Sequence, residues 1–164
     1  MPDRRRGAEL AVLAGRRCTA GGYSTHMATS RPEDAPDHDA LLASMPFSVA
    51  CGVQLQAASA ERVSGRLDWA AERCTAGGVL HGGALMALAD SLGGICAFLN
   101  LPPGAATSTI ESKTNFFRAV RSGHVIAVTT PIHVGRTTIA LQTDIRDADD
   151  RRVAMVIQTQ AVLT

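Results

Sequence analysis

The residues best suited to chemistry are an aspartate inside an apolar stretch and a His-Gly-Gly turn shortly before it. Asp90 follows His81 by nine residues, and Gly82 and Gly83 lie directly after the histidine. A carboxylate can act as a nucleophile or as a general base. Backbone N–H groups at the start of a helix lack partners within the helix and lie at the positive end of its dipole. Such donors stabilise a carbonyl oxygen as it becomes negative, so this combination suits acyl transfer.

Each feature also has a plainer interpretation. Asp90 shares its predicted helix face with small residues only, which are Gly83, Ala87, Gly94 and Ala97. Small residues admit a second helix as readily as a ligand, and in the first case Asp90 would lie at the margin of a packing surface. A Gly-Gly pair before a helix is often a tight turn, and His81 could be a helix cap. Spacing alone leaves both interpretations open.

The element that must position Asp90 is the one long helix that the sequence predicts, between His81 and Leu99. Apolar residues recur there at helical spacing, and Asp90 lies roughly opposite the stripe they form. The stripe consists of Leu85, Leu88, Leu92, Ile95, Cys96 and Leu99. We expect a sheet to bury this stripe.

Period-two alternation predicts two strands before this helix, over residues 47–56 and 63–69. A short helix around Leu41, Leu42 and Met45 precedes them. It should stop near Pro46, because a proline disfavours helical geometry in the residue before it.

Four more strands are expected after the helix, and they make the fold α+β. They span roughly residues 107–117, 124–134, 137–146 and 152–163. Pro131 indicates an edge or a bulge in the second of these strands. Turn residues at Gly135 and at 147–150 predict that the last three strands form an antiparallel meander.

Length and charge describe one globular domain with no obvious affinity for nucleic acid. The chain has 164 residues, a net charge of +1 and 4% aromatic residues, so it lacks the basic field and the stacking platforms that nucleic-acid binding uses. Residues 1–38 carry six basic and five acidic residues without helical or strand periodicity. They are predicted to be a flexible N-terminal extension to a folded domain over residues 39–164.

The cysteines and the N-terminus indicate a cytoplasmic protein without a metal site. Four cysteines lie far apart, with no Cys-x-x-Cys pair and no Cys/His cluster at zinc spacing: Cys18, Cys51, Cys74 and Cys96. The uncharged run at residues 10–15 is too short for a signal-peptide core or for a membrane span. We therefore expect reduced thiols, no export and no membrane partner.

Several motifs together resemble one known family. Residues 78–83 read Gly-Val-Leu-His-Gly-Gly with Asp90 downstream, and residues 111–118 read Glu-Ser-Lys-Thr-Asn-Phe-Phe-Arg. With the Gly-Arg-Thr hairpin at 135–137, the order and approximate spacing resemble the PaaI-like hot-dog-fold acyl-CoA thioesterases over about residues 45–163. The resemblance implies an antiparallel sheet wrapped around one long central helix. It also implies homodimers, commonly paired as homotetramers, with active sites at the subunit interface.

The resemblance also implies roles for single residues. Asp90 would be the nucleophile or the general base, and the N–H of Gly82 would polarise the thioester carbonyl from the opposite subunit, with His81 shaping that turn. Thr75 stands where many relatives have Asn or Gln to hold the carbonyl or the water. Thr109 offers the hydroxyl with which relatives often orient water.

For coenzyme A, the resemblance implies two binding segments, residues 116–121 and the hairpin at 135–137. Their arginines could pair with the phosphates through charge-assisted hydrogen bonds. The expected coenzyme A contacts are Gly83, Phe116, Arg118, Arg121, Gly135, Arg136 and Thr137. No metal or redox cofactor is required.

The resulting hypothesis is hydrolysis of an aryl or fatty acyl-CoA to the free acid and coenzyme A. Two alternatives remain open. One is an acyl-CoA-binding module that has lost turnover. The other is an acyl-thioester hydratase or dehydratase, in which His81 and a carboxylate would form an acid/base pair.

Overall fold

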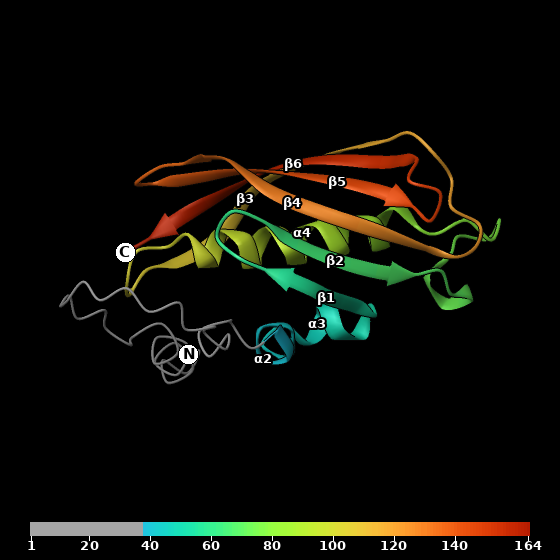
Figure 1. Cartoon of the computed structure of the whole chain (residues 1–164), viewed down its shortest axis with the longest axis horizontal. Helices are drawn as coiled ribbons and strands as arrows, with labels where there is room; N and C mark the ends of the chain where they lie inside the picture. The colour runs from blue at the N-terminus through green and yellow to red at the C-terminus, as the bar shows by residue number, and fades with distance from the viewer. Residues whose placement is uncertain (1–37) are drawn as a thin grey trace, which may run out of the picture.

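The computed structural model describes residues 38–164 and shows one long helix, α4 (Gly82–Leu99), against a six-stranded antiparallel sheet (Figure 1). Two short helices, α2 (His38–Ala43) and α3 (Pro46–Ala50), come first, and a short 3₁₀ helix, η1 (Ala71–Arg73), precedes α4. The strands are β1 (Val53–Ala58), β2 (Val63–Asp68), β3 (Ala106–Phe116), β4 (His124–Val134), β5 (Thr138–Asp147) and β6 (Arg152–Leu163). This arrangement confirms the predicted α+β fold.

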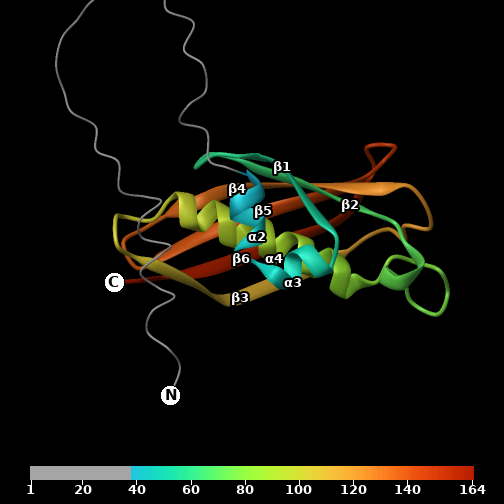
Figure 2. The same ribbon diagram turned by 90° about the horizontal axis from the view of Figure 1, so that it is seen from below.

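The sheet order is β1-β2-β4-β5-β6-β3, and every neighbouring pair is antiparallel. The predicted meander of the last three strands is confirmed. β3 follows the helix directly in sequence but crosses to the far side of the meander and pairs only with β6. It is therefore an edge strand, and Figure 2 shows it running beside α4 on the side where α3 also lies.

Pro131 sits at a bulge, as predicted. The register between β4 and β5 shifts between Pro131 and His133. The pairing of β4 with β2 ends at Thr129, so no β2 residue stands opposite the proline. Its missing N–H therefore leaves the β2 pairing intact.

The prediction of a strand over residues 47–56 is wrong in its first half, where the chain forms helix α3. Pro46 occupies the first turn of α3, where its fixed φ suits a helix and its missing N–H removes no helical hydrogen bond. The alternating Phe47 and Val49 are 71% and 52% exposed, whereas Ser48 between them is buried. The apolar alternation was real, but it did not mark a buried strand face. Gly52, with a φ of +79°, reverses the chain before β1.

The structure tests the predicted N-terminal extension only at its last residue. The predicted extension, residues 1–38, lies outside the described residues except for His38, which begins α2. The predicted short helix over Leu41 and Leu42 is this α2, which ends at Ala43.

The apolar stripe of α4 packs on the sheet. Five of its residues are at most 3% exposed: Leu85, Leu88, Leu92, Ile95 and Cys96; Leu99 is half-buried. Burial raises the pKa of the Cys96 thiol to about 11, so it remains protonated at neutral pH. By length and composition α4 could cross a membrane, with a mean hydropathy of 1.6, but half of it is buried in the fold. The core helix of a globular domain has the same character.

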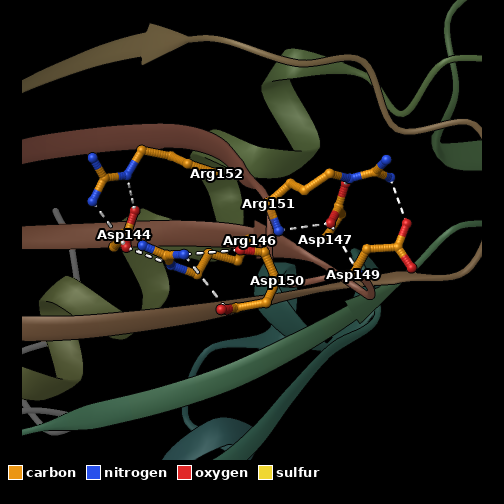
Figure 3. A network of polar contacts seen from close by, with 7 residues as sticks. All are labelled: Asp144, Arg146, Asp147, Asp149, Asp150, Arg151 and Arg152. Carbon is orange, nitrogen blue, oxygen red and sulfur yellow. Dashed lines mark hydrogen bonds and ion pairs between the residues drawn. The ribbon is translucent and has the colours of Figure 1, made fainter.

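Arginines and aspartates join the ends of β5 and β6 (Figure 3). Arg152 Nε and Arg146 Nε donate to the two oxygens of Asp144 at 2.6 and 2.9 Å. Burial alone would raise the pKa of Asp144, but the hydrogen bonds from the two arginines outweigh it and hold the pKa below its usual value. In the turn itself, Arg151 Nε donates to Asp147 at 2.9 Å. The cluster is internally paired and closes the β5–β6 hairpin.

Candidate active site

Asp90 lines a cavity of about 300 Å³ between α3, α4 and the start of β3, which we call the Asp90 cavity. The helical wall of this cavity consists of Ala87, Asp90, Ser91 and Gly94. These positions are spaced i, i+3, i+4 and i+7 and so form one face of α4. A Cβ added at Gly94 would meet nothing within 4 Å. The small-residue face predicted around Asp90 is thus open at Gly94, whereas Ala97 on the same predicted face is buried.

Two side chains hold one oxygen of Asp90. Thr109 Oγ1 donates to Asp90 Oδ1 at 3.1 Å, and Gln158 Nε2 donates to the same oxygen. Gln160 Nε2 in turn donates to Thr109 Oγ1 at 2.8 Å. No residue within 38–164 hydrogen-bonds Asp90 Oδ2. The carboxylate is therefore anchored through one oxygen, and the other is available.

A pair of buried serines forms another part of the Asp90 cavity wall. Ser48 Oγ and Ser91 Oγ lie 2.7 Å apart, and Ser91 Oγ donates to the carbonyl of Ala87 at 2.6 Å. Because a carbonyl can only accept, the proton of Ser91 is used there and Ser48 must donate to Ser91. This bond ties α3 to α4, so the polar side of the short helix closes the cavity.

Gly82 lies in a second cavity of about 460 Å³, which we call the Gly82 cavity. His81 is the N-cap of α4, and its Nδ1 accepts from the N–H of Gly83 at 2.8 Å. The N–H of Gly82 has no hydrogen-bond partner in the described part of the chain. The ring of Phe116 lies close to Gly82, with its Cζ 3.0 Å from where a Cβ would stand. An unpaired helix N-terminal donor therefore lies beside an aromatic wall.

The two threonines predicted for catalysis lie in different cavities: Thr109 lines the Asp90 cavity and Thr75 the Gly82 cavity. Thr75 and Arg118 line the Gly82 cavity, so Thr75 does not approach Asp90 within one chain. Arg121 Nη1 donates to the carbonyl of Gly77 at 3.0 Å and so braces the loop before α4. Thr109, by contrast, is in direct contact with Asp90.

The predicted coenzyme A residues are not all brought together within one chain. Phe116 pairs with Ala154 on β6, whereas Thr138, next to the 135–137 hairpin, pairs with Ala161. Seven strand residues separate these points, which is about 24 Å. Gly135, Arg136 and Thr137 therefore lie at the opposite end of the sheet from Arg118 and Arg121.

Asp90 and Gly82 are also separate. They are eight residues apart on one helix, which corresponds to about 12 Å along its axis. A single thioester carbonyl cannot contact both in one chain. The same reasoning separates Asp90 from His81, whose Nδ1 is already engaged as a cap. One chain therefore presents two half-sites and no His81–Asp90 acid/base pair.

The sequence interpretation missed two glutamines on β6. Gln158 and Gln160 are each 1% exposed and face α4. A signal was available, because they continue the period-two positions of the buried Val156 on a predicted strand. Polar residues on the buried face of a strand need partners, and here the partners are Asp90 and Thr109.

A six-stranded antiparallel sheet around one long helix, with a helical carboxylate and a free helix N-terminus, defines a hot-dog fold of the thioesterase type. The thioesterase superfamily sequence model matches residues 77–154. A Pseudomonas aeruginosa protein named "Putative esterase PA1618" is 30% identical over 131 residues, covering 78% of this chain and 90% of the relative. The chain belongs to the thioesterase superfamily.

Solved structures and other relatives support membership of the thioesterase superfamily. The crystal structure of a mutant thioesterase from Pseudomonas aeruginosa superposes with a TM-score of 0.75 at 29% identity, covering 80% of this chain and 96% of that one. The "Proofreading thioesterase EntH" of Cronobacter sakazakii is 35% identical over 86 residues, 52% of this chain and 63% of the relative. Several alignments are similarly short: the one with a Haemophilus influenzae relative spans 62% of that protein.

Proposed function

We propose that this protein is an acyl-CoA thioesterase, which hydrolyses an aryl or fatty acyl-CoA to the free acid and coenzyme A. The observation that carries the proposal is the carboxylate of Asp90, which lines the Asp90 cavity with one oxygen anchored and one free. The unpaired N–H of Gly82 supplies the second requirement, a donor for the carbonyl oxygen. Membership of the thioesterase superfamily supports thioester hydrolysis as the reaction.

The complete site is proposed to form between two copies of the chain. β3 is the edge of the sheet, and its start borders the Asp90 cavity while its end borders the Gly82 cavity. Two copies related by a two-fold axis across this edge would run their β3 strands antiparallel. The Asp90 cavity of one copy would then face the Gly82 cavity of the other. This pairing would also bring the 135–137 hairpin of one copy toward Arg118 of the other.

In this site the thioester carbonyl accepts from the Gly82 N–H, and Asp90 acts on the carbonyl carbon. As a nucleophile, Asp90 bonds to that carbon and the thiolate of coenzyme A leaves, after which water cleaves the mixed anhydride. As a general base, Asp90 takes a proton from water, whose oxygen bonds to the carbon instead. Either route consumes one water and releases the acid and the thiol. Arg118 lines the Gly82 cavity, and in this proposal its guanidinium binds the phosphates of coenzyme A.

The test is thiol release from phenylacetyl-, hydroxybenzoyl- and short to long fatty acyl-CoA, with wild type and Asp90→Asn assayed side by side. Asn keeps an oxygen that can accept from Thr109 and Gln158 but has no basic or nucleophilic oxygen. We expect turnover to fall by about 100-fold or more while the circular dichroism spectrum is unchanged. A folded Asp90→Asn variant with full activity would rule out this mechanism.

The same assay separates the alternatives. Acyl-CoA binding without thiol release by the wild type would indicate a binding module. Hydration of an enoyl-CoA would indicate a hydratase, which the engagement of His81 as a helix cap disfavours.

A further inference from the structure

We propose that Gln158 is a positioning residue that fixes Asp90 so that Oδ2 is the oxygen that reacts. The inference rests on the proposed function and extends it to a residue on β6, outside the His-Gly-Gly turn and the helix. The two oxygens of the Asp90 carboxylate differ in their hydrogen-bond partners. Gln158 Nε2 and Thr109 Oγ1 both donate to Oδ1, and Oδ2 accepts from no described residue.

Burial and neighbouring hydrogen bonds keep the Gln158 amide beside Asp90. It is 1% exposed, and its Nε2 also lies 3.2 Å from Thr109 Oγ1. Gln160 Nε2 donates to the same hydroxyl, and Gln160 Oε1 accepts from Thr107 Oγ1 at 3.1 Å. Thr109 is thereby directed toward Asp90 by two amides. The result is a chain of hydrogen bonds from β6 and β3 that ends on Oδ1.

The placement of Gln158 is locally unfavourable in two respects. Its Oε1 is buried and has no hydrogen-bond partner among residues 38–164, and an unsatisfied buried carbonyl opposes folding. In addition, a Cβ at Gly93 would overlap this oxygen, so α4 carries a glycine where alanine would favour the helix. Both features occur at the one contact that orients Asp90. If Gln158 orients the Asp90 carboxylate, that role explains both the unpaired Oε1 and the glycine at position 93.

The consequence for the reaction is specific. With Oδ1 engaged by two donors, the carboxylate cannot rotate freely, and the bond to the acyl carbon, or to the proton of water, forms through Oδ2. Removing the Gln158 amide leaves the charge of Asp90 in place but loses its orientation. Substrate binding should change little, whereas the chemical step should slow.

The test compares Gln158→Met with Gln160→Met, two substitutions of similar shape on the same face of β6. For Gln158→Met we expect kcat to fall by about 10- to 100-fold with little change in KM, and the thermal midpoint to stay the same or rise because the unsatisfied Oε1 is gone. Gln160→Met removes an amide whose two ends are both paired. It should lower the thermal midpoint and reduce kcat less than Gln158→Met does.

Crystal structures of the wild type and Gln158→Met provide a readout that does not depend on turnover. We expect the Asp90 carboxylate to be rotated or disordered in the variant. Unchanged kcat in an active enzyme, or an Asp90 that keeps its conformation, would overturn the inference. If the wild type releases no thiol from any acyl-CoA, the proposed function fails. The position of Asp90 in the two crystal structures then still decides whether Gln158 orients it.

Discussion

At the scale of single residues, His81 and Gly82 divide two roles that the sequence left as alternatives. The histidine is a helix cap, as the plainer interpretation held, and it accepts from Gly83. The cap pairs the N–H of Gly83, the second residue of α4, and the N–H of Gly82, the first residue, has no partner among the described residues. The cap and the proposed oxyanion donor are therefore complementary features of one turn.

Replacing Gly82 with proline or alanine tests the donor directly. Gly82 is the first residue of α4, where proline is tolerated, and His81 has a φ of −65° and a ψ of 136°, which suit a residue before proline. Gly82→Pro removes the N–H, whereas Gly82→Ala keeps it and adds the same Cβ beside Phe116. We expect kcat to fall by about 100- to 1000-fold for proline and clearly less for alanine. Equal activities of the two folded variants, measured by thiol release, would argue against the Gly82 N–H as the donor to the carbonyl oxygen.

Some residue contacts could not have been foreseen. The resemblance named Thr109 and Asp90, and the structure brings them into contact. It also named Thr75, which lies in the other cavity within one chain. Whether residues far apart in sequence meet depends on strand register, and β3 carries a register shift between Thr109 and Glu111 that no periodicity indicates.

At the scale of elements, the helix and the late strands were predictable because their apolar periods match their burial. The α3 segment was not predictable, because its Phe47 and Val49 are exposed and only a serine is buried.

The two adjacent glycines of α4 look alike in sequence but differ in their surroundings. In the structure Gly93 meets Gln158 and Gly94 meets open space.

Replacing Gly93 and Gly94 with alanine should therefore change the free energy of unfolding in opposite directions. Gly94→Ala gains helix propensity without a clash, so we expect the free energy of unfolding to rise by up to about 1 kcal/mol. Gly93→Ala forces Gln158 to move, and overpacking of this kind lowers the free energy of unfolding by about 1–3 kcal/mol. Urea denaturation of both variants measures the difference. Equal stabilisation by the two would show that Gln158 is not packed against α4.

At the scale of the whole molecule, the separation of Asp90 from Gly82 means that the proposed activity would require two paired chains. The resemblance implied active sites at a subunit interface, and the two half-sites give this a geometric reason. The edge position of β3 shows which surface would join them.

Mixing two inactive variants tests this arrangement. In a dimer of one Asp90→Asn chain and one Gly82→Pro chain, one site carries both substitutions and the other carries neither. After subunit exchange of equal amounts, we expect about a quarter of wild-type activity, since half the dimers are mixed and each has one intact site. Thiol release by the mixture is compared with each variant alone. Activity equal to their average would mean that each chain has its own complete site.

The order of elements along the chain also has a consequence for synthesis. α4 precedes β3, β4, β5 and β6, so four of the six strands are made only after the apolar helix has left the ribosome. Until they are added, the helix lacks most of its cover, and its mean hydropathy of 1.6 resembles that of a membrane segment. An exposed apolar surface of this kind is prone to aggregation. Chains cut short before β6 should therefore depend on chaperones and accumulate as insoluble protein.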